Sequence, residues 1–301
     1  MASEAFSTIR RILAAKPLPL DVRGMREALE ATARPLVPGV RGEPVDAGGV
    51  PCEMQTPEGA SDGRIVLYLH GGGYVGGSVA SHRNLTSHLA RASGCAVLSV
   101  DYRRAPEAPH PAAVEDASAA FRWLLGRGHD PARLAIAGDS AGGGLAVATQ
   151  LRLRDAGDPL PAASALLSPW VDLAGTGETM LTHAARDPIV TPATIAWLAG
   201  LFLGPEGSAG DPLASPLEAD LAGLPPMLIH VGEDEVLLSD SERLAAKAAA
   251  AGVDVTLEVW PEMVHVWHAM AGLFVEADAA IRRVGEFLGS PRRLGSRRRD
   301  A

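Results

Sequence analysis

Cysteine is scarce in this sequence, and acidic residues outnumber basic ones. Its two cysteines, Cys52 and Cys95, are too few for a disulfide framework in a chain of 301 residues, which fits a reducing cytoplasm. Cys95 lies in an apolar run and is expected to be a small core residue. The formal net charge of −9 argues against nucleic acid as a partner, because an anionic surface repels phosphate.

Long apolar runs and the common metal and nucleotide motifs are missing as well. No apolar stretch approaches the roughly 20 residues that span a bilayer, so no stable membrane anchor is expected. Residues 1–13 carry Glu4 early and Arg10 and Arg11 inside the apolar pattern, which predicts an amphipathic helix and not a signal peptide. Without a CxxC pair, an HExxH stretch or a Walker-type Gly-Lys-Ser/Thr, the sequence predicts neither a metal nor a cofactor.

What the sequence does contain is an alternation of short apolar strands and amphipathic helices. The hydrophobic fraction of 47% is enough for a substantial core. The runs that predict strands buried in a sheet are residues 64–70, 95–100, 134–138, 165–170 and 227–231, followed by the alternating strand 253–260. Helical patterns lie between them, which predicts an α/β fold built on a parallel sheet.

Two segments do not fit this alternation. Residues 3–35 read as helices broken at Pro17 and Pro19. The segment 171–215 contains a helix that begins at Thr191-Pro192, ends at Gly204 and is apolar nearly all round. It is either a core helix or a lid whose apolar underside lines a pocket. The arginine-rich tail, residues 290–301, is expected to be disordered; a role in binding an acidic partner is the less favoured reading.

The stretch 134–143 contains the residue around which the chain is organised. Its apolar strand runs into Ser140, which is flanked by Gly138 and Gly142, and a helical pattern follows at once. This is the Gly-x-Ser-x-Gly turn that exposes a serine above a sheet, with small residues wherever a side chain would collide. In a chain with 33 glycines the pattern is also compatible with a turn that has no chemistry.

A serine hydroxyl becomes a useful nucleophile only beside a base that an acid orients. In an α/β sheet such partners follow the carboxyl ends of strands. Asp234 lies just after the strand 227–231, and His265 just after the last strand. The order Ser140, Asp234, His265 is the one described for α/β-hydrolases.

Other assignments of the acid and the base stay open. His268 could replace His265, although it lies further into the next helical pattern, and His230 and His110 are expected to be structural. The neighbouring carboxylates that could serve as the acid are Glu233, Glu235 and Asp240.

The site also needs donors for the negative oxygen that forms when a serine attacks a carbonyl carbon. Backbone N–H groups are the usual donors. The N–H of Ala141, directly after the serine, is one, and the glycines that follow His70 can bring further N–H groups close. The stretch 70–73 on its own would be a flexible loop; with the serine turn, the acid and the histidine it is better explained as an oxyanion hole.

Together these motifs resemble the hormone-sensitive-lipase family of α/β-hydrolases, in its bacterial branch. The resemblance covers about residues 43–289. The matching stretches are His70–Tyr74, Asp101–Arg103, Ala105–Glu107, Pro111–Asp116, Gly138–Gly143 and Ser168–Trp170, with His265 near the end.

The resemblance implies an eight-stranded, mostly parallel sheet with helices on both faces. It implies a catalytic domain over residues 43–289, under a helical cap built from residues 1–42 and the insertion at about 171–215. It also implies a Ser140, Asp234, His265 triad and an oxyanion hole made by the amides of Gly72, Gly73 and Ala141. In that arrangement Gly71 is the less favoured donor, and His70 shapes the loop.

The activity implied is hydrolysis of short- to medium-chain acyl esters through an acyl-enzyme. An amidase or peptidase on the same triad is the alternative within enzymes. A small-ligand receptor of the same fold is the alternative outside them, but the gibberellin receptor, which resembles this family, lacks the catalytic histidine that His265 supplies here. The partners expected are a small ester and, through the last strand and helix, a second copy of the chain.

Two positions depart from the family pattern. Relatives often have Asp-Pro-Leu after the acid strand, where this chain has Asp234-Glu235-Val236-Leu237. Relatives often have Gly-Phe after the catalytic histidine, where this chain has Val266-Trp267. The aromatic residues expected to line the substrate pocket are Tyr74, Trp170 and Trp267.

Overall fold

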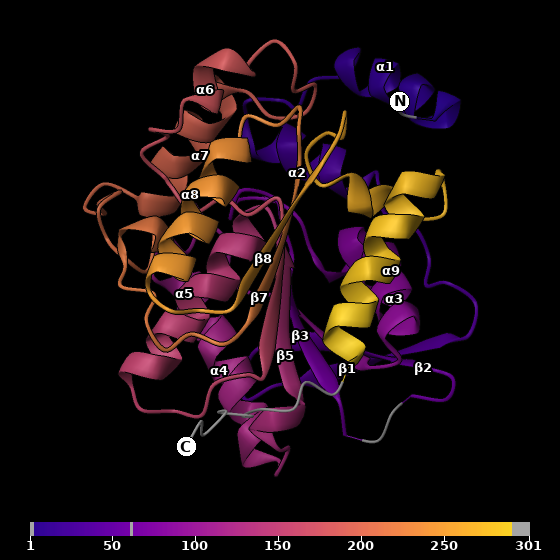
Figure 1. Cartoon of the computed structure of the whole chain (residues 1–301), viewed down its shortest axis with the longest axis vertical. Helices are drawn as coiled ribbons and strands as arrows, with labels where there is room; N and C mark the ends of the chain where they lie inside the picture. Colours follow the sequence, from indigo (N-terminus) through magenta and orange to yellow (C-terminus); the bar gives the residue numbers. More distant parts are fainter. Residues whose placement is uncertain (1–2, 61–62, 291–301) are drawn as a thin grey trace, which may run out of the picture.

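A sheet of eight strands forms the centre of the protein in a computed structural model that describes residues 3–60 and 63–290 (Figure 1). The strands are β1 (Val40–Asp46), β2 (Pro51–Pro57), β3 (Ile65–Leu69), β4 (Ala96–Val100), β5 (Leu134–Asp139), β6 (Ala163–Leu167), β7 (Met227–Gly232) and β8 (Val255–Trp260). Their order is β1-β2-β4-β3-β5-β6-β7-β8. Only the pairings of β2 with β1 and β4 are antiparallel among the described residues, which confirms the predicted mostly parallel sheet.

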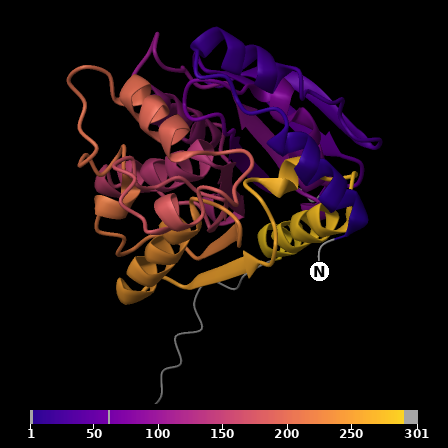
Figure 2. The ribbon, with the colours of Figure 1, turned by 90° about the horizontal axis from the view of Figure 1, so that it is seen from above.

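Helices cover both faces of the sheet and one of its ends. They are α1 (Glu4–Ala14), α2 (Val22–Glu30), α3 (Val79–Ser93), α4 (Ala112–Gly126), α5 (Ala141–Asp155), α6 (Thr179–Thr182), α7 (Pro192–Leu203), α8 (Leu238–Ala250) and α9 (Val275–Gly289). Helices α3 and α9 lie on one face, while α4, α5 and α8 lie on the other (Figure 1). The N-terminal helices and the segment with α6 and α7 lie over the end at which the parallel strands finish (Figures 1 and 2).

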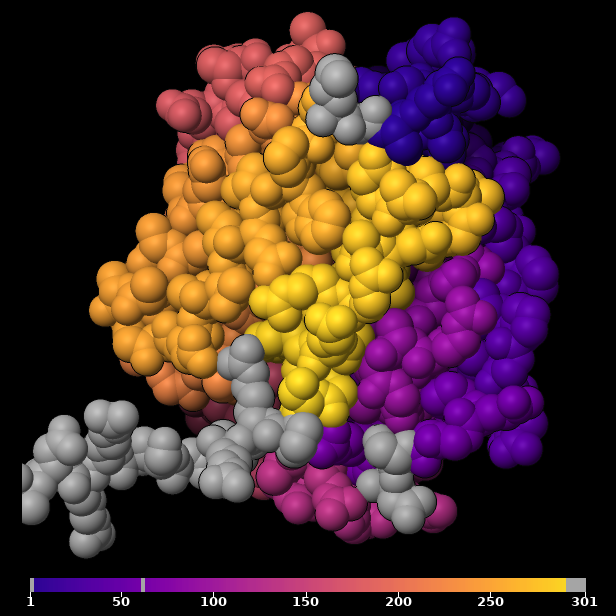
Figure 3. All heavy atoms as spheres, turned by 45° about the vertical axis from the view of Figure 1, so that its right-hand side comes forward, coloured from indigo at the N-terminus to yellow at the C-terminus, as the bar shows by residue number. Residues whose placement is uncertain are grey.

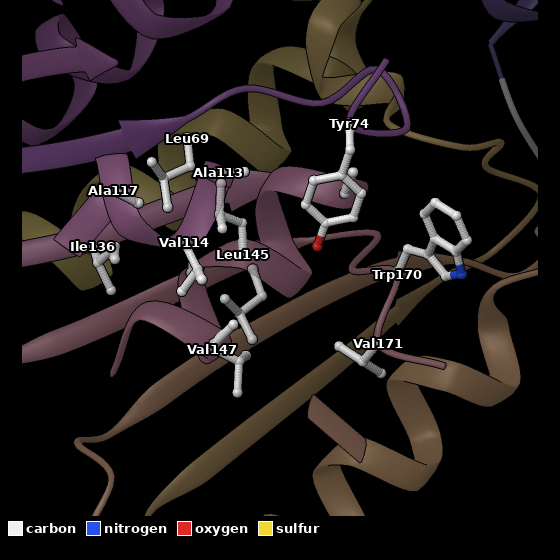
Figure 4. Packing of buried hydrophobic residues seen from close by; sticks show 14 of the residues in the cluster. Leu69, Tyr74, Ala113, Val114, Ala117, Ile136, Leu145, Val147, Trp170 and Val171 are labelled. Atoms are coloured by element: carbon white, nitrogen blue, oxygen red, sulfur yellow. The ribbon is translucent and has the colours of Figure 1, made fainter. Parts of the chain in front are cut away.

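The parallel strands form because their side chains are apolar on both faces. All five residues of β3 are buried, with Leu67 and Leu69 in the core toward α4 and α5, and Val66 and Tyr68 in the core toward α3 and α9. Figure 4 shows the first of these cores, in which Leu69 lies near side chains of α4 and α5. The edge strand β1 instead alternates exposed and half-buried residues, as expected where one side faces water.

The first strand and the last helix mark the two ends of the sheet domain. Strand β1 begins at Val40, which pairs with Pro57. The last helix begins at Val275, after a short 3-10 turn, η3 (Trp267–Met270), that ends at Ala271 in an extended conformation. The predicted disordered tail, residues 290–301, lies outside the described residues from position 291 onward.

The N-terminal helix α1 packs against the segment that leads into α9. Ser3 bonds through its N–H and hydroxyl to the carboxylate of Glu276, and the rings of Phe6 and Phe274 lie 5.1 Å apart. Figure 3 shows this contact from outside, with the N-terminal segment in indigo above the yellow C-terminal one. Across residues 3–60 and 63–290, none of the helices is long and apolar enough to cross a membrane.

Candidate active site

Ser140 stands at the sharp junction between β5 and α5. Its backbone has φ 53° and ψ −122°, a conformation that costs a side-chain-bearing residue about 1–3 kcal/mol and persists only when its surroundings enforce it. A Cβ on Gly138 would overlap the carbonyl of Gly142, and a Cβ on Gly142 would overlap the carbonyl oxygen of Leu69. The flanking glycines are therefore required because the backbones of α5 and of the neighbouring strand β3 fill the space of a side chain.

His265 reaches Ser140 from the loop after β8. Its Nε2 lies 2.9 Å from the Ser140 Oγ, and the imidazole is 6% exposed. Val266, directly after it, has a left-handed φ of 48°, and its N–H donates to the Ser168 hydroxyl over 3.1 Å. The loop is thus fixed directly after the histidine, and the predicted serine and histidine lie within one hydrogen bond of each other.

The carboxylate that meets His265 is Glu235, and the prediction of Asp234 at this position is wrong. The Glu235 Oε2 lies 2.8 Å from the Nδ1 of His265. Its other oxygen, Oε1, accepts hydrogen bonds from the Ser168 hydroxyl over 2.7 Å and from the Gly232 N–H over 2.5 Å. The Glu235 side chain is fully buried, and these donors hold it in one orientation.

Asp234 instead faces the cap. Its carboxylate pairs with Arg10 of α1 and with Arg186 of the insertion. The cause is the turn after β7: the Asp234 N–H bonds to the Met263 carbonyl and the Glu235 N–H to that of Gly232, so the two side chains leave the backbone in different directions. The other two carboxylates that the sequence allows as the triad acid accept hydrogen bonds from the backbone instead. Glu233 accepts one from the Glu262 N–H, and Asp240 accepts those of Val171 and Asp172.

The surroundings of His265 favour its charged form. Burial works against the imidazolium, but the hydrogen bond and negative charge of Glu235, with Asp187 adding to them, raise the pKa of His265 above its ordinary value. A histidine in this position can take a proton from Ser140 and hold it beside a fixed carboxylate.

The glycine loop after β3 borders the same space. The Gly71 N–H donates to the Oδ1 of Asp139 over 3.0 Å, which turns it away from Ser140 and agrees with its lower rank as a donor. Gly72 and Gly73 line the cavity, with φ of 115° and 62°. Ala141 is the first residue of α5, where an N–H has no acceptor within the helix. Gly72, Gly73 and Ala141 as the oxyanion hole stay a prediction.

Asp139 and His82 form a buried pair that the sequence reasoning missed. The Asp139 carboxylate lies 3.3 Å from the Nε2 of His82 and accepts the Tyr68 hydroxyl over 2.7 Å. Burial would raise the pKa of Asp139, but the charge and hydrogen bond of His82 and the bond from Tyr68 lower it on balance. Asp139 lies in the serine motif itself, whereas nothing in the sequence marks His82 as its partner.

His70 lies behind the glycine loop. Its Nδ1 lies 2.8 Å from the Gly71 carbonyl oxygen, and its ring stacks on that of Tyr102 at 4.2 Å. Burial lowers the pKa of His70 to about 3, so the side chain is neutral. A neutral, tightly packed ring is suited to shaping the loop, as expected from the sequence.

A cavity of about 420 Å³ opens above Ser140 and His265, beneath the cap. Helix α7 supplies Ile195 and Leu198 to its wall while burying Phe202 and Leu198 in the core, so it is both a core helix and part of the roof. Among the described residues, no group of three or more His, Cys, Asp or Glu side chains is arranged to hold a metal ion.

Of the three aromatic residues predicted for the pocket, only Trp170 lines this cavity among the described residues. Tyr74 is buried and stacks on Phe202 with ring centroids 3.7 Å apart; Figure 4 shows it beside Trp170. Trp267 is fully buried against His268, with ring centroids 3.9 Å apart. Tyr74 and Trp267 are wrong as pocket residues because both fill gaps between elements behind the site.

Known proteins with the same sequence pattern are hydrolases. A family model described as the alpha/beta hydrolase fold matches residues 66–269. An acetyl-hydrolase from Streptomyces hygroscopicus is 50% identical over 247 residues, which cover 82% of this chain and 82% of that protein.

Solved structures give the same result at the level of the fold. The crystal structure of an esterase from the bacterial hormone-sensitive lipase family has a TM-score of 0.92 and 47% identity, covering 96% of this chain and 98% of the other. A crystal structure of EstE5, soaked with p-nitrophenyl butyrate, has a TM-score of 0.93 and 44% identity, covering 96% and 99%. This chain therefore belongs to the α/β-hydrolase fold family and, within it, to the bacterial hormone-sensitive-lipase group of carboxylesterases.

Proposed function

We propose that the protein hydrolyses short- to medium-chain carboxylic esters through a triad of Ser140, His265 and Glu235. The observation that carries the proposal is the continuous chain of hydrogen bonds from the Glu235 carboxylate through both nitrogens of His265 to the Ser140 hydroxyl. The chain ends at the floor of a cavity, where an ester carbonyl can approach the serine oxygen.

In the first step His265 removes the proton from the Ser140 hydroxyl as its oxygen attacks the ester carbonyl carbon. The negative oxygen that forms is bound by the N–H groups of Gly72, Gly73 and Ala141, each contributing about 3 kcal/mol to lowering the barrier. Glu235 stabilises the imidazolium, which then gives its proton to the departing alcohol. An acyl group remains on Ser140.

In the second step a water molecule replaces the alcohol. His265 takes a proton from the water as it attacks the acyl carbon, and then returns a proton to the Ser140 oxygen when the acid is released. No metal or cofactor takes part, since the chain supplies the nucleophile, the base and the oxyanion donors itself.

The size of the cavity supports a preference for short to medium acyl chains. A space of about 420 Å³, roofed by α7 and the N-terminal helices, has room for a small ester. The EstE5 crystal soaked with p-nitrophenyl butyrate makes butyrate esters a sound first substrate series for this chain as well. Turnover of p-nitrophenyl acetate, butyrate, octanoate and laurate is expected to fall sharply at the longer chains.

The decisive experiment replaces the nucleophile. Ser140→Ala is expected to abolish turnover of p-nitrophenyl butyrate while leaving the melting temperature within a few degrees of the wild type, because the change removes one oxygen. A fluorophosphonate probe is expected to label the wild type and not the variant. Undiminished turnover by the variant would refute the proposal. Comparing p-nitroanilides with the matching esters separates an esterase from an amidase, and a receptor would turn over neither.

The expected homodimer remains a proposal of the same kind. Strand β8 lies at the edge of the sheet, and its Val259 side chain is 40% exposed, which leaves an apolar edge for a second copy. Light scattering coupled to gel filtration tests it, with Val259→Lys expected to shift the mass toward that of a single chain.

A further inference from the structure

The cavity above Ser140 has two walls of different chemistry. The first comes from the turn after β6 and from the insertion, and its residues are Trp170, Ile189, Val190, Thr194, Ile195 and Leu198. The second comes from the N-terminal segment, α3 and the loop after His265. Its apolar members include Met25, Leu29, Leu85 and Met270. Among the described residues, this second wall carries more polar side chains than the first, which has Thr194. Its polar side chains are Thr32, Arg34, Ser81, His82 and Asn84.

Arg34 is the positively charged side chain of that second wall that has no acidic partner among the described residues, whereas His82 is paired with Asp139. Its Nη1 donates to the Ala271 carbonyl over 3.1 Å and its Nη2 to the Ala269 carbonyl over 2.5 Å, and Ala269 itself lines the cavity. A guanidinium has five N–H donors, so further donors remain for a ligand. Within residues 3–60 and 63–290, no carboxylate forms an ion pair with Arg34.

The positive charge of Arg34 has no acidic partner within the part of the chain that the structure describes. Burial lowers the pKa of Arg34. The pKa of His88, on α3, is lowered by burial and by the positive charges of Arg91 and Arg34, while the negative charge of Asp278 works against them. Asp139 is the acidic side chain that borders the cavity, and His82 already pairs with it.

We propose that the second wall selects esters that carry a carboxylate, with Arg34 binding that group while the insertion wall holds the apolar half of the substrate. The inference rests on the proposed ester hydrolysis and names a substrate class for the same site. A carboxylate matches the planar, forked donors of a guanidinium, and the bond is strongest where water is scarce. A neutral ester fits the cavity without using this charge.

The experiment uses two pairs of esters that differ only in charge, one for each half of the substrate. The first pair is 4-acetoxybenzoate and 4-acetoxybenzamide, with the anion on the alcohol side. The second pair is mono-p-nitrophenyl adipate and the p-nitrophenyl ester of adipic acid monoamide, with the anion on the acyl side. The kcat/KM of each ester is measured for the wild type, Arg34→Gln, Arg34→Lys and the control Arg23→Gln. Arg23 lies on α2, 88% exposed and paired with Glu27, so its loss changes the net charge equally.

In at least one pair, Arg34→Gln is expected to lower the ratio of anionic to neutral kcat/KM by about tenfold or more, the size of a charged hydrogen bond. Arg34→Lys should keep part of the ratio and Arg23→Gln all of it. An equal loss on both members of each pair, or no change, would show that Arg34 only ties the loop after His265 in place, and would overturn the proposal.

A measurement on the wild type keeps the test decisive if Arg34→Gln does not fold. In the wild type, 4-hydroxybenzoate or adipic acid monoamide is expected to inhibit the hydrolysis of p-nitrophenyl acetate at least about tenfold more strongly than 4-hydroxybenzamide or adipamide, because only the anions can bind Arg34. Equal inhibition constants for anionic and neutral compounds overturn the inference. Failure of the wild type to hydrolyse even the neutral esters would contradict the proposed function instead, which separates the two outcomes.

Discussion

The catalytic floor at the end of the sheet and the cap above it are held together by different interactions. On the floor, the half-buried Ser140 and the buried His265 and Glu235 are joined by short hydrogen bonds. The cap is joined to the floor by arginines whose side chains remain partly exposed, 32% for Arg10 and 45% for Arg186. Buried contacts are barely screened by water and salt, whereas exposed ion pairs are weak. The floor is therefore suited to fixed chemistry, and the cap to adjustment around different substrates.

The difference between the floor and the cap is visible in two consecutive residues, Asp234 and Glu235. The Glu235 side chain faces the floor, where it orients His265, and the Asp234 side chain faces the cap, where it joins α1 to the insertion. Substituting each of them in turn tests directly whether the floor and the cap have these different roles.

The largest expected effect is that of Glu235→Gln. An amide can neither stabilise the imidazolium nor keep the histidine in the required tautomer, so kcat should fall by about a thousandfold or more. Asp234→Asn, which is isosteric and one residue away, should cost no more than about tenfold. Steady-state kinetics with p-nitrophenyl butyrate compare them. If the two losses were reversed, Asp234 would be the acid and the proposed triad would be wrong.

The next largest effect is on the free energy of unfolding, when a methyl group is added to a helical glycine of the floor or of the cap. Gly142→Ala should lower the free energy of unfolding by at least about 2 kcal/mol, because the new methyl overlaps the Leu69 carbonyl in the neighbouring strand. Gly200→Ala, in α7 of the cap, meets open space and should raise stability by about 1 kcal/mol. Urea unfolding followed by circular dichroism measures both. Equal losses would mean that the cap is packed as tightly as the floor.

A smaller effect is expected from loosening the cap. Arg10→Gln and Arg186→Gln each remove one partner of Asp234, which should raise KM by a few-fold with little change in kcat, because the proposed chemistry lies below. Because salt screens these ion pairs, the KM of the wild type should also rise in part at high salt. The KM of the double variant, which lacks both pairs, should not change with salt. A fall in kcat alone would place these arginines in the chemistry and not in the cap.

The sequence predicted those parts of the molecule in which one residue type is required by local geometry. Gly138 and Gly142 are needed because neighbouring backbone fills the space of a side chain, and the all-apolar β3 and β5 are needed because both of their faces are covered. Ser140 and His265 could be placed because each follows a recognisable strand.

Predictions from the sequence are wrong where the role of a residue depends on the direction in which its side chain points. Which of two adjacent carboxylates meets His265 depends on a turn whose hydrogen bonds run to Met263 and Gly232, and no pattern in the sequence encodes those bonds. Tyr74 and Trp267 were expected in the pocket because aromatic residues near a site suggest lining, but tertiary packing took both into the core. The role proposed for Arg34 could not be predicted either, because it depends on the lack of an acidic partner in space among the described residues.

The smallest effect, and the most specific one, is on the pH dependence of kcat/KM. The proposed mechanism needs neutral His265, so activity is lost as the pH falls through the pKa of this residue. Since Glu235 raises that pKa, the acid limb of the wild type should lie above the ordinary histidine value of about 6.5. In Glu235→Gln the residual activity should have its acid limb at lower pH, because the charge that favours the imidazolium is gone. In Asp234→Asn the limb should stay close to that of the wild type, because Asp234 is paired with two arginines and the carboxylates that raise the pKa of His265 are Glu235, Asp187 and Asp139. Profiles of kcat/KM for p-nitrophenyl butyrate, corrected for spontaneous hydrolysis, would contradict the assignment of Glu235 if the limb moved in the Asp234 variant alone.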